Sequence, residues 1–495
     1  MQSTQTCGNI CRWHAVDNNA GTQLPDSVNN IMNTWVLQMG FPVVTIDTQT
    51  GGISQKHFLL DPDSTVTVES PFNYEWIVPI KWMKTGVIHP TIQWLKAKSD
   101  TVNEMKTSGP SVWVLANLNV LGYYRVNYDQ GNWDRLLNAL RTNHTSIPGI
   151  NRAQLVDDAF NLARAKIIPT VLALKTTKYL QLERDYVPWK SALNNLDFFY
   201  LMFDRSEVYG PMQNYLMKQI TPLFTYYKTM TGNWSTVPAG HMDQYNQVNA
   251  ISMACRTGLE ECTTLTKTWF KQWMDTNKNQ IHPNLRSTVY CNAIAAGGAK
   301  EWEFAWSEFQ KATIASEAEK LRSALYLDYT LNSTLIRKQD ATSTIVYIAS
   351  NVAGQSLAYG GGSFSFSNLI NGVTERFSTE YELQQLKQFK ADNSEVGFGS
   401  GTLALDQSIE RTISNIKWIT ENKQNVMNWF KAELKLYEAS SGTGRVKTRK
   451  SSSGGSAPSI KSCWMQPETQ YLVIELNSKL TKNRSTSCTQ TSPEN

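Results

Sequence analysis

Histidines are the side chains of this chain best suited to bind a catalytic metal, and their spacing argues against a zinc peptidase site. A zinc peptidase helix carries two histidines four residues apart with a glutamate directly after the first, so that both imidazoles face the metal and the glutamate lies beside its bound water. No histidine here is followed by glutamate, and no two have that spacing: His14, His57, His89, His144, His241 and His282. The sequence therefore predicts no catalytic residue and no metal ligand of this kind.

Other motifs that carry chemistry are also absent from the sequence. It contains neither a Gly-x-Ser-x-Gly nucleophile elbow nor a phosphate loop ending in Gly-Lys-Ser/Thr. The glycine-rich stretches 360–362 and 397–401 do not follow a strand of a βαβ unit, and we interpret them as connections between helices. The carboxylate pairs at 157–158 and 260–261 are expected on polar helix faces or loops, where solvent surrounds them.

Cysteines and Asn-x-Ser/Thr triplets indicate an extracellular setting. Cys255 and Cys262 flank a short polar loop that could bring the two sulfurs together, and two unrelated buried thiols are the alternative. Cys7 and Cys11 have no second pair at zinc-finger spacing, which disfavours a structural zinc site. Triplets that fit N-glycosylation begin at Asn143, Asn233, Asn332 and Asn483.

Composition and charge exclude several classes of protein. The chain has 495 residues, of which 41% are hydrophobic and 18% charged, so it can bury a sizeable core. Its net charge of +5 is mild, and its one dense basic run, at 445–450, lies among Ser and Gly as in a solvated tail. A nucleic-acid partner is therefore not expected. The sequence has no apolar run long enough to span a membrane, and its first 14 residues do not resemble a signal peptide.

The order of hydrophobic patterns predicts the elements that must position any site. Short β-rich runs at 35–39, 43–46, 57–60, 75–80 and 112–115 predict a small β-sandwich over 27–130. Helical spacing then predicts an all-α superhelix of HEAT/ARM type over 131–435, and Asn151 is expected to cap a helix that runs to Pro169. The Ser/Gly/Lys-rich residues 436–495 are expected to form a disordered tail. Further helices are predicted at 189–202, 212–230, 245–255, 303–325, 379–391 and 402–434.

Several stretches resemble one family closely. Met-Gly-Phe-Pro-Val at 39–43 resembles the start of the β domain that follows the catalytic domain in M1 zinc metalloaminopeptidases. Gly-Tyr-Tyr-Arg-Val-Asn-Tyr at 122–128 resembles its junction with the helical C-terminal domain. The segments 202–212, 282–291 and 376–386 are similar to that family almost residue for residue, and the likeness runs from about 15 to 434. The first 26 residues are partly foreign to the family.

The resemblance implies both an activity and its loss. Members of the family lie outside the cell, anchored at the plasma membrane, and use zinc to remove N-terminal residues from peptides. No methionine here is followed by glutamate, so the family's Gly-x-Met-Glu-Asn motif is missing along with the His-Glu-x-x-His helix. The resemblance therefore implies an inactive portion without cofactor of its own, which supplies cavity walls and the contacts of a homodimer through its helical domain.

Two gaps relative to the family carry structural expectations. One follows Leu325, where the family has a further segment with a cysteine that pairs with the residue matching Cys291, and the other follows Ala358. We therefore expect Cys291 to lack a partner, whereas the resemblance implies that Cys255 and Cys262 still pair. Loss of a helix from a solenoid exposes its neighbours' apolar faces, so reduced stability is expected. The gaps indicate an alternatively spliced or imperfectly predicted transcript.

Binding is the alternative function that the resemblance implies. In the family, the helical domain of some members is a docking surface for certain coronavirus spikes, and residues 226–246 match that exposed region. The predicted docking residues are Tyr226, Asn233, Trp234, Gln244 and Tyr245. A third interpretation is a peptide-binding α-solenoid with no retained role.

Overall fold

The computed structural model describes residues 24–331, apart from 64, 65 and 67, and residues 367–440, apart from 368, 369, 373, 396 and 397. These residues form two compact units. The first contains the described residues up to Thr257 together with helices α15 (Glu380–Asp392) and α16 (Thr402–Ser440). The second contains those from Gly258 to the end of α12 (Ala315–Leu331). The domain boundaries predicted after residues 26, 130 and 435 stay predictions.

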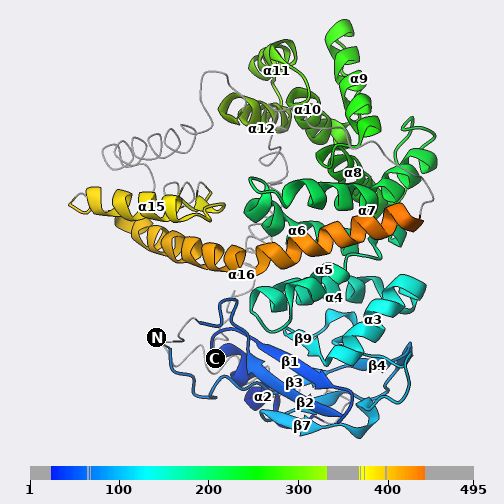
Figure 1. The fold of residues 1–495 in the computed structure, drawn as a ribbon, viewed down its shortest axis with the longest axis vertical. Helices are drawn as coiled ribbons and strands as arrows, with labels where there is room; N and C mark the ends of the chain where they lie inside the picture. The colour runs from blue at the N-terminus through cyan, green and yellow to red at the C-terminus, as the bar shows by residue number, and fades with distance from the viewer. Residues whose placement is uncertain are drawn as a thin grey trace, which may run out of the picture. The chain divides into compact units, whose positions relative to one another are not determined.

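Three small sheets open the first unit (Figure 1). In the four-stranded sheet, of order β7-β2-β1-β9, β1 (Pro42–Asp47) pairs antiparallel with β2 (Gly52–His57) and parallel with β9 (Arg125–Tyr128). Val44 and Ile46 of β1 are fully buried, as alternation toward a core requires. The other strands are β3 (Val78–Ile80), β4 (Trp82–Lys84), β5 (Val87–Ile88), β6 (Gln93–Leu95), β7 (Ser99–Thr101) and β8 (Val114–Ala116), in the orders β3-β6 and β5-β4-β8.

The strand predicted at 35–39 is wrong, because helix α2 (Val28–Val36) includes its first two residues and the other three lie in the bend that follows the helix. The Ser27 hydroxyl accepts a hydrogen bond from the Asn30 backbone N–H at 3.2 Å and caps this helix. Val28, Ile31 and Thr34 are buried on one face at three-residue spacing. The prediction failed because the apolar residues at the end of this amphipathic helix resemble a β-rich run.

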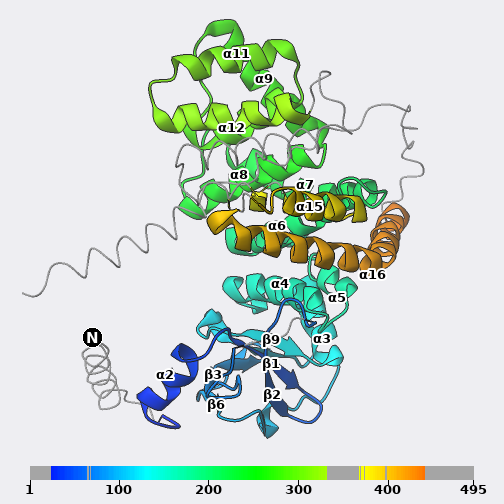
Figure 2. The ribbon, with the colours of Figure 1, turned by 90° about the vertical axis from the view of Figure 1, so that its left-hand side faces the viewer.

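Helices make up the rest of the first unit, and those predicted at 189–202, 212–230, 245–255, 379–391 and 402–434 are confirmed. Helix α4 packs against α5 and α6, α7 packs against α8, and α16 runs along α5 and α7 (Figures 1 and 2). The tail predicted over 436–495 is wrong for 436–440, which belong to α16, and residues 441–495 lie outside the described residues. The remaining bounds are α3 (Gln130–Asn143), α4 (Gly149–Arg164), α5 (Thr170–Lys175), α6 (Tyr186–Phe203), α7 (Tyr209–Met230) and α8 (His241–Arg256).

Asn151 does not cap its helix as predicted. Helix α4 begins two residues earlier, with Pro148 at the cap position, and Asn151 is fully buried in the first turn. Its amide donates to the Asn117 carbonyl oxygen (3.0 Å), and its Oδ1 accepts from the Asn119 N–H (2.9 Å). The Asn151 side chain therefore hydrogen-bonds to two backbone groups of the loop before β9 and links that loop to α4.

The second unit is formed by α9 (Glu260–Thr276), α10 (Arg286–Ala295), α11 (Ala299–Lys311) and α12. Helix α10 packs against the other three. The single helix predicted over 303–325 is two helices, because the chain breaks at 312–314 between α11 and α12. Single-turn 3-10 helices lie at Asn103–Met105, Leu118–Val120, His144–Ser146, Leu180–Leu182, Pro283–Leu285 and Gly399–Gly401.

Aromatic rings fix α16 against α6. Trp418 of α16 is 7% exposed, and its ring centre lies 4.8 Å from that of Phe198, 5.3 Å from that of Phe199 and 5.5 Å from that of Phe203. The predicted fold class, a small β-sandwich followed by an all-α superhelix, is confirmed in that small β-sheets are followed by a mostly helical region. Within the described ranges, every helix is too short or too polar to cross a membrane.

Candidate functional sites

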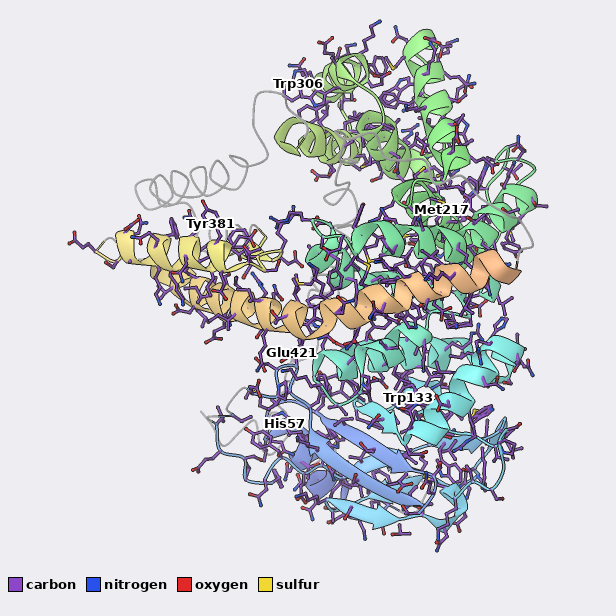
Figure 3. The ribbon with its side chains drawn as sticks, in the orientation of Figure 1. His57, Trp133, Met217, Trp306, Tyr381 and Glu421 are labelled. Atoms are coloured by element: carbon purple, nitrogen blue, oxygen red, sulfur yellow. The ribbon has the colours of Figure 1, made fainter. Side chains whose placement is uncertain are left out.

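The described part of the chain offers no metal centre, since none of its His, Cys, Asp and Glu side chains gather in groups of three or more that could hold an ion. The histidines that the structure describes have packing or capping roles instead. His57 (Figure 3), for example, stacks on Tyr74 with ring centres 4.3 Å apart, and burial lowers its pKa. These residues do not fit a zinc ion, so we assign no chemical step to one.

The two predicted docking tyrosines lie near the end of α7 and the start of α8. Tyr226 is 37% exposed, and the Arg184 guanidinium carbon lies 5.4 Å from the centre of its ring. Tyr245 is 40% exposed, and its ring centre is 5.6 Å from that of Tyr186 and 5.0 Å from that of His241. One cation and two further rings therefore lie beside the two tyrosines. The sequence did not indicate Arg184 and Tyr186 as their neighbours, because these residues lie at or just before the start of α6, a whole helix before α7.

The loop between these helices carries the other predicted docking residues. Asn233 is exposed, and both Asn233 and Trp234 have left-handed backbone, with φ of 59° and 68°. Trp234 is half-buried, with its ring centre 4.8 Å from that of Phe224. The Gln244 amide donates to the Pro238 carbonyl oxygen at 3.0 Å. Trp234 and Gln244 thus hold the loop in shape, whereas the Asn233 side chain is open to solvent.

Two of the predicted glycosylation sites are described by the structure. Asn143 and Asn233 are both exposed, as glycan attachment requires. The Thr145 hydroxyl donates to Oδ1 of Asn143 at 2.9 Å. Asn332 and Asn483 lie outside the described residues. Attachment of glycans stays a prediction at all four.

The cysteine expectations need one correction. Cys255, Cys262 and Cys291 are each disulfide-bonded in the structure. The expectation that Cys291 lacks a partner is therefore wrong, because it considered only the segment missing after Leu325, although the chain has seven cysteines. The specific pairing of Cys255 with Cys262 stays a prediction.

A cavity of about 280 Å³ lies where the chain entering β9 meets α4, within the first unit. Aromatic and aliphatic side chains alternate with charged ones around it. The loop before β9, the residue before β1 and the first turns of α4 all contribute. Its wall includes Phe41, Tyr123, Arg125, Ile150, Asp157 and Asp158.

Ion pairs at one side of the cavity join β9 to α4. Nη1 of Arg125 lies 2.7 Å from Oδ2 of Asp157 and 3.0 Å from Oδ1 of Asp158. Asp158 also accepts from the Val126 N–H (3.0 Å) and from the Gln154 amide (3.2 Å). Asp158 is therefore held from three directions, whereas the side chain of Asp157 is 44% exposed.

The two carboxylates consequently differ in electrostatics. Burial raises the pKa of Asp158 to about 7, against the opposing effects of the Arg125 charge and the Val126 N–H. Burial disfavours the Arg125 charge, but Asp158 and Asp157 outweigh it and raise the pKa of the guanidinium. The expectation that both residues of the 157–158 pair are solvated is wrong for Asp158, which is 4% exposed. Glu260 and Glu261 are exposed in the first turn of α9.

The cavity had no signal in the sequence. Arg125 precedes Asp157 by 32 residues, and only the packing of α4 on β9 brings the two together. An arginine two residues after Tyr123 and a pair of carboxylates on a helix are each common in protein sequences. Only the tertiary fold brings these side chains together.

The fold and these sites define a mostly helical C-terminal domain preceded by small β-sheets and lacking, within the described residues, a metal cluster. The family model described as the ERAP1-like C-terminal domain matches residues 113–414, more than half of the chain. The chain belongs to this family and corresponds to the C-terminal portion of M1 aminopeptidases.

Curated relatives agree with this assignment. The chain is 56% identical to aminopeptidase N of Bos taurus over 443 residues, which cover 84% of this chain and 46% of that protein. It is 54% identical to aminopeptidase Ey of Gallus gallus over 448 residues, covering 85% and 46%. Identity to the thyrotropin-releasing hormone-degrading ectoenzyme of Mus musculus is 31% over 442 residues, covering 81% and 41%. The chain thus spans about half the length of these relatives.

Proposed function

We propose that this chain is a non-catalytic C-terminal portion of an M1 zinc metalloaminopeptidase. The observation that carries the proposal is a match to the C-terminal domain over 113–414 in a sequence with neither His-Glu-x-x-His nor Gly-x-Met-Glu-Asn. Intact members of the family remove N-terminal residues from peptides. In this proposal the chain supplies walls of the peptide cavity and contacts of a homodimer, and it hydrolyses no peptide by itself.

The proposal includes a location and a division into domains. Residues 27–130 and 131–435 would be the β and helical domains, flanked by 1–26 and 436–495. The exposed Asn143 and Asn233 and the three disulfide-bonded cysteines support an extracellular setting at the plasma membrane.

Hydrolysis of an alanyl chromogenic substrate tests the loss of activity. We expect the purified chain, with added zinc, to release no product, whereas bovine aminopeptidase N assayed beside it does. Turnover by the purified chain that a zinc chelator abolishes would refute the non-catalytic assignment. Light scattering of the same sample tests the dimer contacts, for which we expect twice the mass of 55.9 kDa.

We propose a protein-binding module, including a docking surface for a coronavirus spike, as the second candidate function. The exposed Tyr226 and Tyr245, with Arg184 beside the first ring, favour it. Aromatic and arginine side chains dominate the energy of protein interfaces. The exposed Asn233 in the adjoining loop would carry a glycan that blocks or completes the surface.

Spike binding by surface plasmon resonance tests this second candidate. Tyr226→Ala is expected to weaken binding by about tenfold or more. Asn233→Gln is expected to change binding, and the matched variant Asn143→Gln, which removes another exposed triplet, is expected to leave it unchanged. Absence of binding by every form, with and without glycans, would end this candidate.

A further inference from the structure

Arg164, in the last turn of α4, has a charged side chain without an acceptor. Every other arginine whose side chain the structure describes donates at least one hydrogen bond to an oxygen atom. The described residues offer Arg164 neither a hydrogen bond nor an ion pair. Because arginine is rarely taken out of water without a partner, the unpaired guanidinium calls for an explanation.

An aromatic ring, and not a counter-ion, adjoins this guanidinium. Cζ of Arg164 lies 4.1 Å from the centre of the Phe198 ring on α6, and both residues are half-buried. Burial lowers the pKa of Arg164, and no carboxylate raises it again. Asp157, seven residues earlier on the same face of α4, is bound to Arg125 instead. The ring therefore orients the guanidinium but leaves its charge unmatched.

A second donor beside Phe198 also lacks an acceptor. Trp418 of α16 is 7% exposed, its ring centre lies 4.8 Å from that of Phe198, and its Nε1 has no hydrogen-bond partner. Among the described residues of α4, α6 and α16, the buried side-chain atoms without a partner are all donors. An acceptor is therefore the group that is missing where these three helices contact one another.

The neighbouring ion pairs leave one positive charge in excess. Lys166, two residues after Arg164, lies 2.9 Å from a carboxylate oxygen of Glu421 on α16 (Figure 3). Lys417, on the same helix, pairs with Asp63. Each of these lysines is matched by a carboxylate, so only the charge of Arg164 remains for a ligand. A monoanion suits it better than a phosphate group, which carries about 1.5 to 2 negative charges at pH 7.

We propose that Arg164 and Phe198 form a binding site for a carboxylate group carried on an apolar body. The two oxygens of the carboxylate accept from the guanidinium, whose planar fork matches their geometry, and the apolar body lies against the half-buried ring. A free carboxylic acid and a glutamate side chain of a polypeptide both supply this group. The site shares no residue with the cavity beside β9, and the proposal does not depend on the non-catalytic function proposed above.

Ligand-observed NMR titration of the full native chain tests the proposal with two pairs of probes. Phenylacetate is compared with phenylacetamide, and acetyl-Ala-Glu-Ala-amide is compared with the peptide that carries glutamine instead. Each pair differs in charge but little in shape. We expect at least one carboxylate to bind about tenfold or more tightly than its amide, and the pair that shows this preference identifies the source of the group. Absence of the preference in both pairs, or tighter binding of inorganic phosphate, would overturn the proposal without any variant.

Variants then locate the site. Arg164→Met is expected to abolish the preference for carboxylate over amide, because it removes the charge and keeps an apolar stem beside Phe198. The matched control is Lys166→Met, which removes a cation two residues further along that already pairs with Glu421. We expect this control to keep the full preference. A preference that survives Arg164→Met, or disappears equally in Lys166→Met, would contradict the proposed site.

A structural role for Arg164 at the end of α4 is the competing explanation, since a cation there also interacts favourably with the helix dipole. Melting temperatures without ligand distinguish the two. We expect Arg164→Met to leave the melting temperature unchanged or to raise it, because the variant removes a partly buried charge that has no partner. A marked fall in the melting temperature would show that the guanidinium stabilises the fold, and that result would overturn its assignment to a ligand.

Discussion

A buried ion pair between Arg152 and Glu183 joins the first turn of α4 to the segment before α6. Nε and Nη2 of Arg152 lie 2.6 Å and 3.1 Å from the two carboxylate oxygens of Glu183, whose side chain is 1% exposed. The same guanidinium donates to Asp185 (2.6 Å), which is 63% exposed. Two carboxylates on one arginine therefore differ strongly in burial, and the buried one, Glu183, also binds the guanidinium through both oxygens.

Glu183→Gln is expected to lower the free energy of unfolding by about 3 kcal/mol, because it removes the buried charged partner of Arg152 and leaves the exposed Asp185 to compensate that guanidinium. Asp185→Asn is the control, and its expected cost is below about 1 kcal/mol, because solvent screens an exposed pair. Urea unfolding followed by circular dichroism measures both. Equal effects of the two substitutions would show that burial does not govern this pair.

Asp158 makes stability depend on pH with a defined sign. Burial raises its pKa to about 7 in the folded chain, above the ordinary value of 3.8, so the folded state binds this proton more tightly than the unfolded state does. Its contribution to stability is complete below about pH 4 and is lost as the pH rises to about 7.

We therefore expect the difference in melting temperature between the native chain and Asp158→Asn to change steadily from pH 5 to pH 7 in the direction that disfavours the native chain. Above about pH 8 the difference becomes nearly constant, since the carboxyl group is then ionised in both states. Melting curves at half-unit steps measure it. A difference that grows in favour of the native chain over this range would mean that Arg125 dominates over burial.

Long amphipathic helices are the elements that the sequence predicts well. Helices α6, α7 and α16 follow the apolar spacing of 189–202, 212–230 and 402–434, because each buries one face along most of its length. The break at 312–314 and the helix α2 were missed, since a three-residue interruption of Ala, Thr and Ile and a nine-residue helix differ little from their surroundings in hydropathy. The cavity was missed because contacts across the fold, such as that of Arg125 with Asp157, leave no periodic trace in the sequence.

Trp418 tests the packing of one element on another. Trp418→Ala is expected to destabilise the first unit by about 3–5 kcal/mol, because it removes a buried indole from among three rings of α6. The control is Trp306→Ala (Figure 3), because Trp306 is 42% exposed on α11 and mainly stacks on Trp302. Its expected cost is about 1 kcal/mol. Comparable losses from the two substitutions would contradict the assigned packing of α16.

The division into two units has a consequence for the whole molecule. Because the described residues form two compact units, we expect calorimetry to show more than one unfolding transition. Trp418→Ala should lower the transition of the first unit, and Trp306→Ala should affect only the other. A single transition that both substitutions lower together would show that the chain unfolds as one cooperative body. The same calorimetric traces test whether the gaps after residues 325 and 358 reduce the stability of the chain.

The absence of a zinc-binding helix from the sequence is the central point of the functional account. Zinc stoichiometry of the purified chain after equilibrium dialysis, measured by plasma mass spectrometry beside bovine aminopeptidase N, tests it most directly. We expect the chain to retain far less than one equivalent of zinc and to release no alanine from an alanyl substrate. One tightly bound zinc ion per chain, accompanied by turnover, would contradict it.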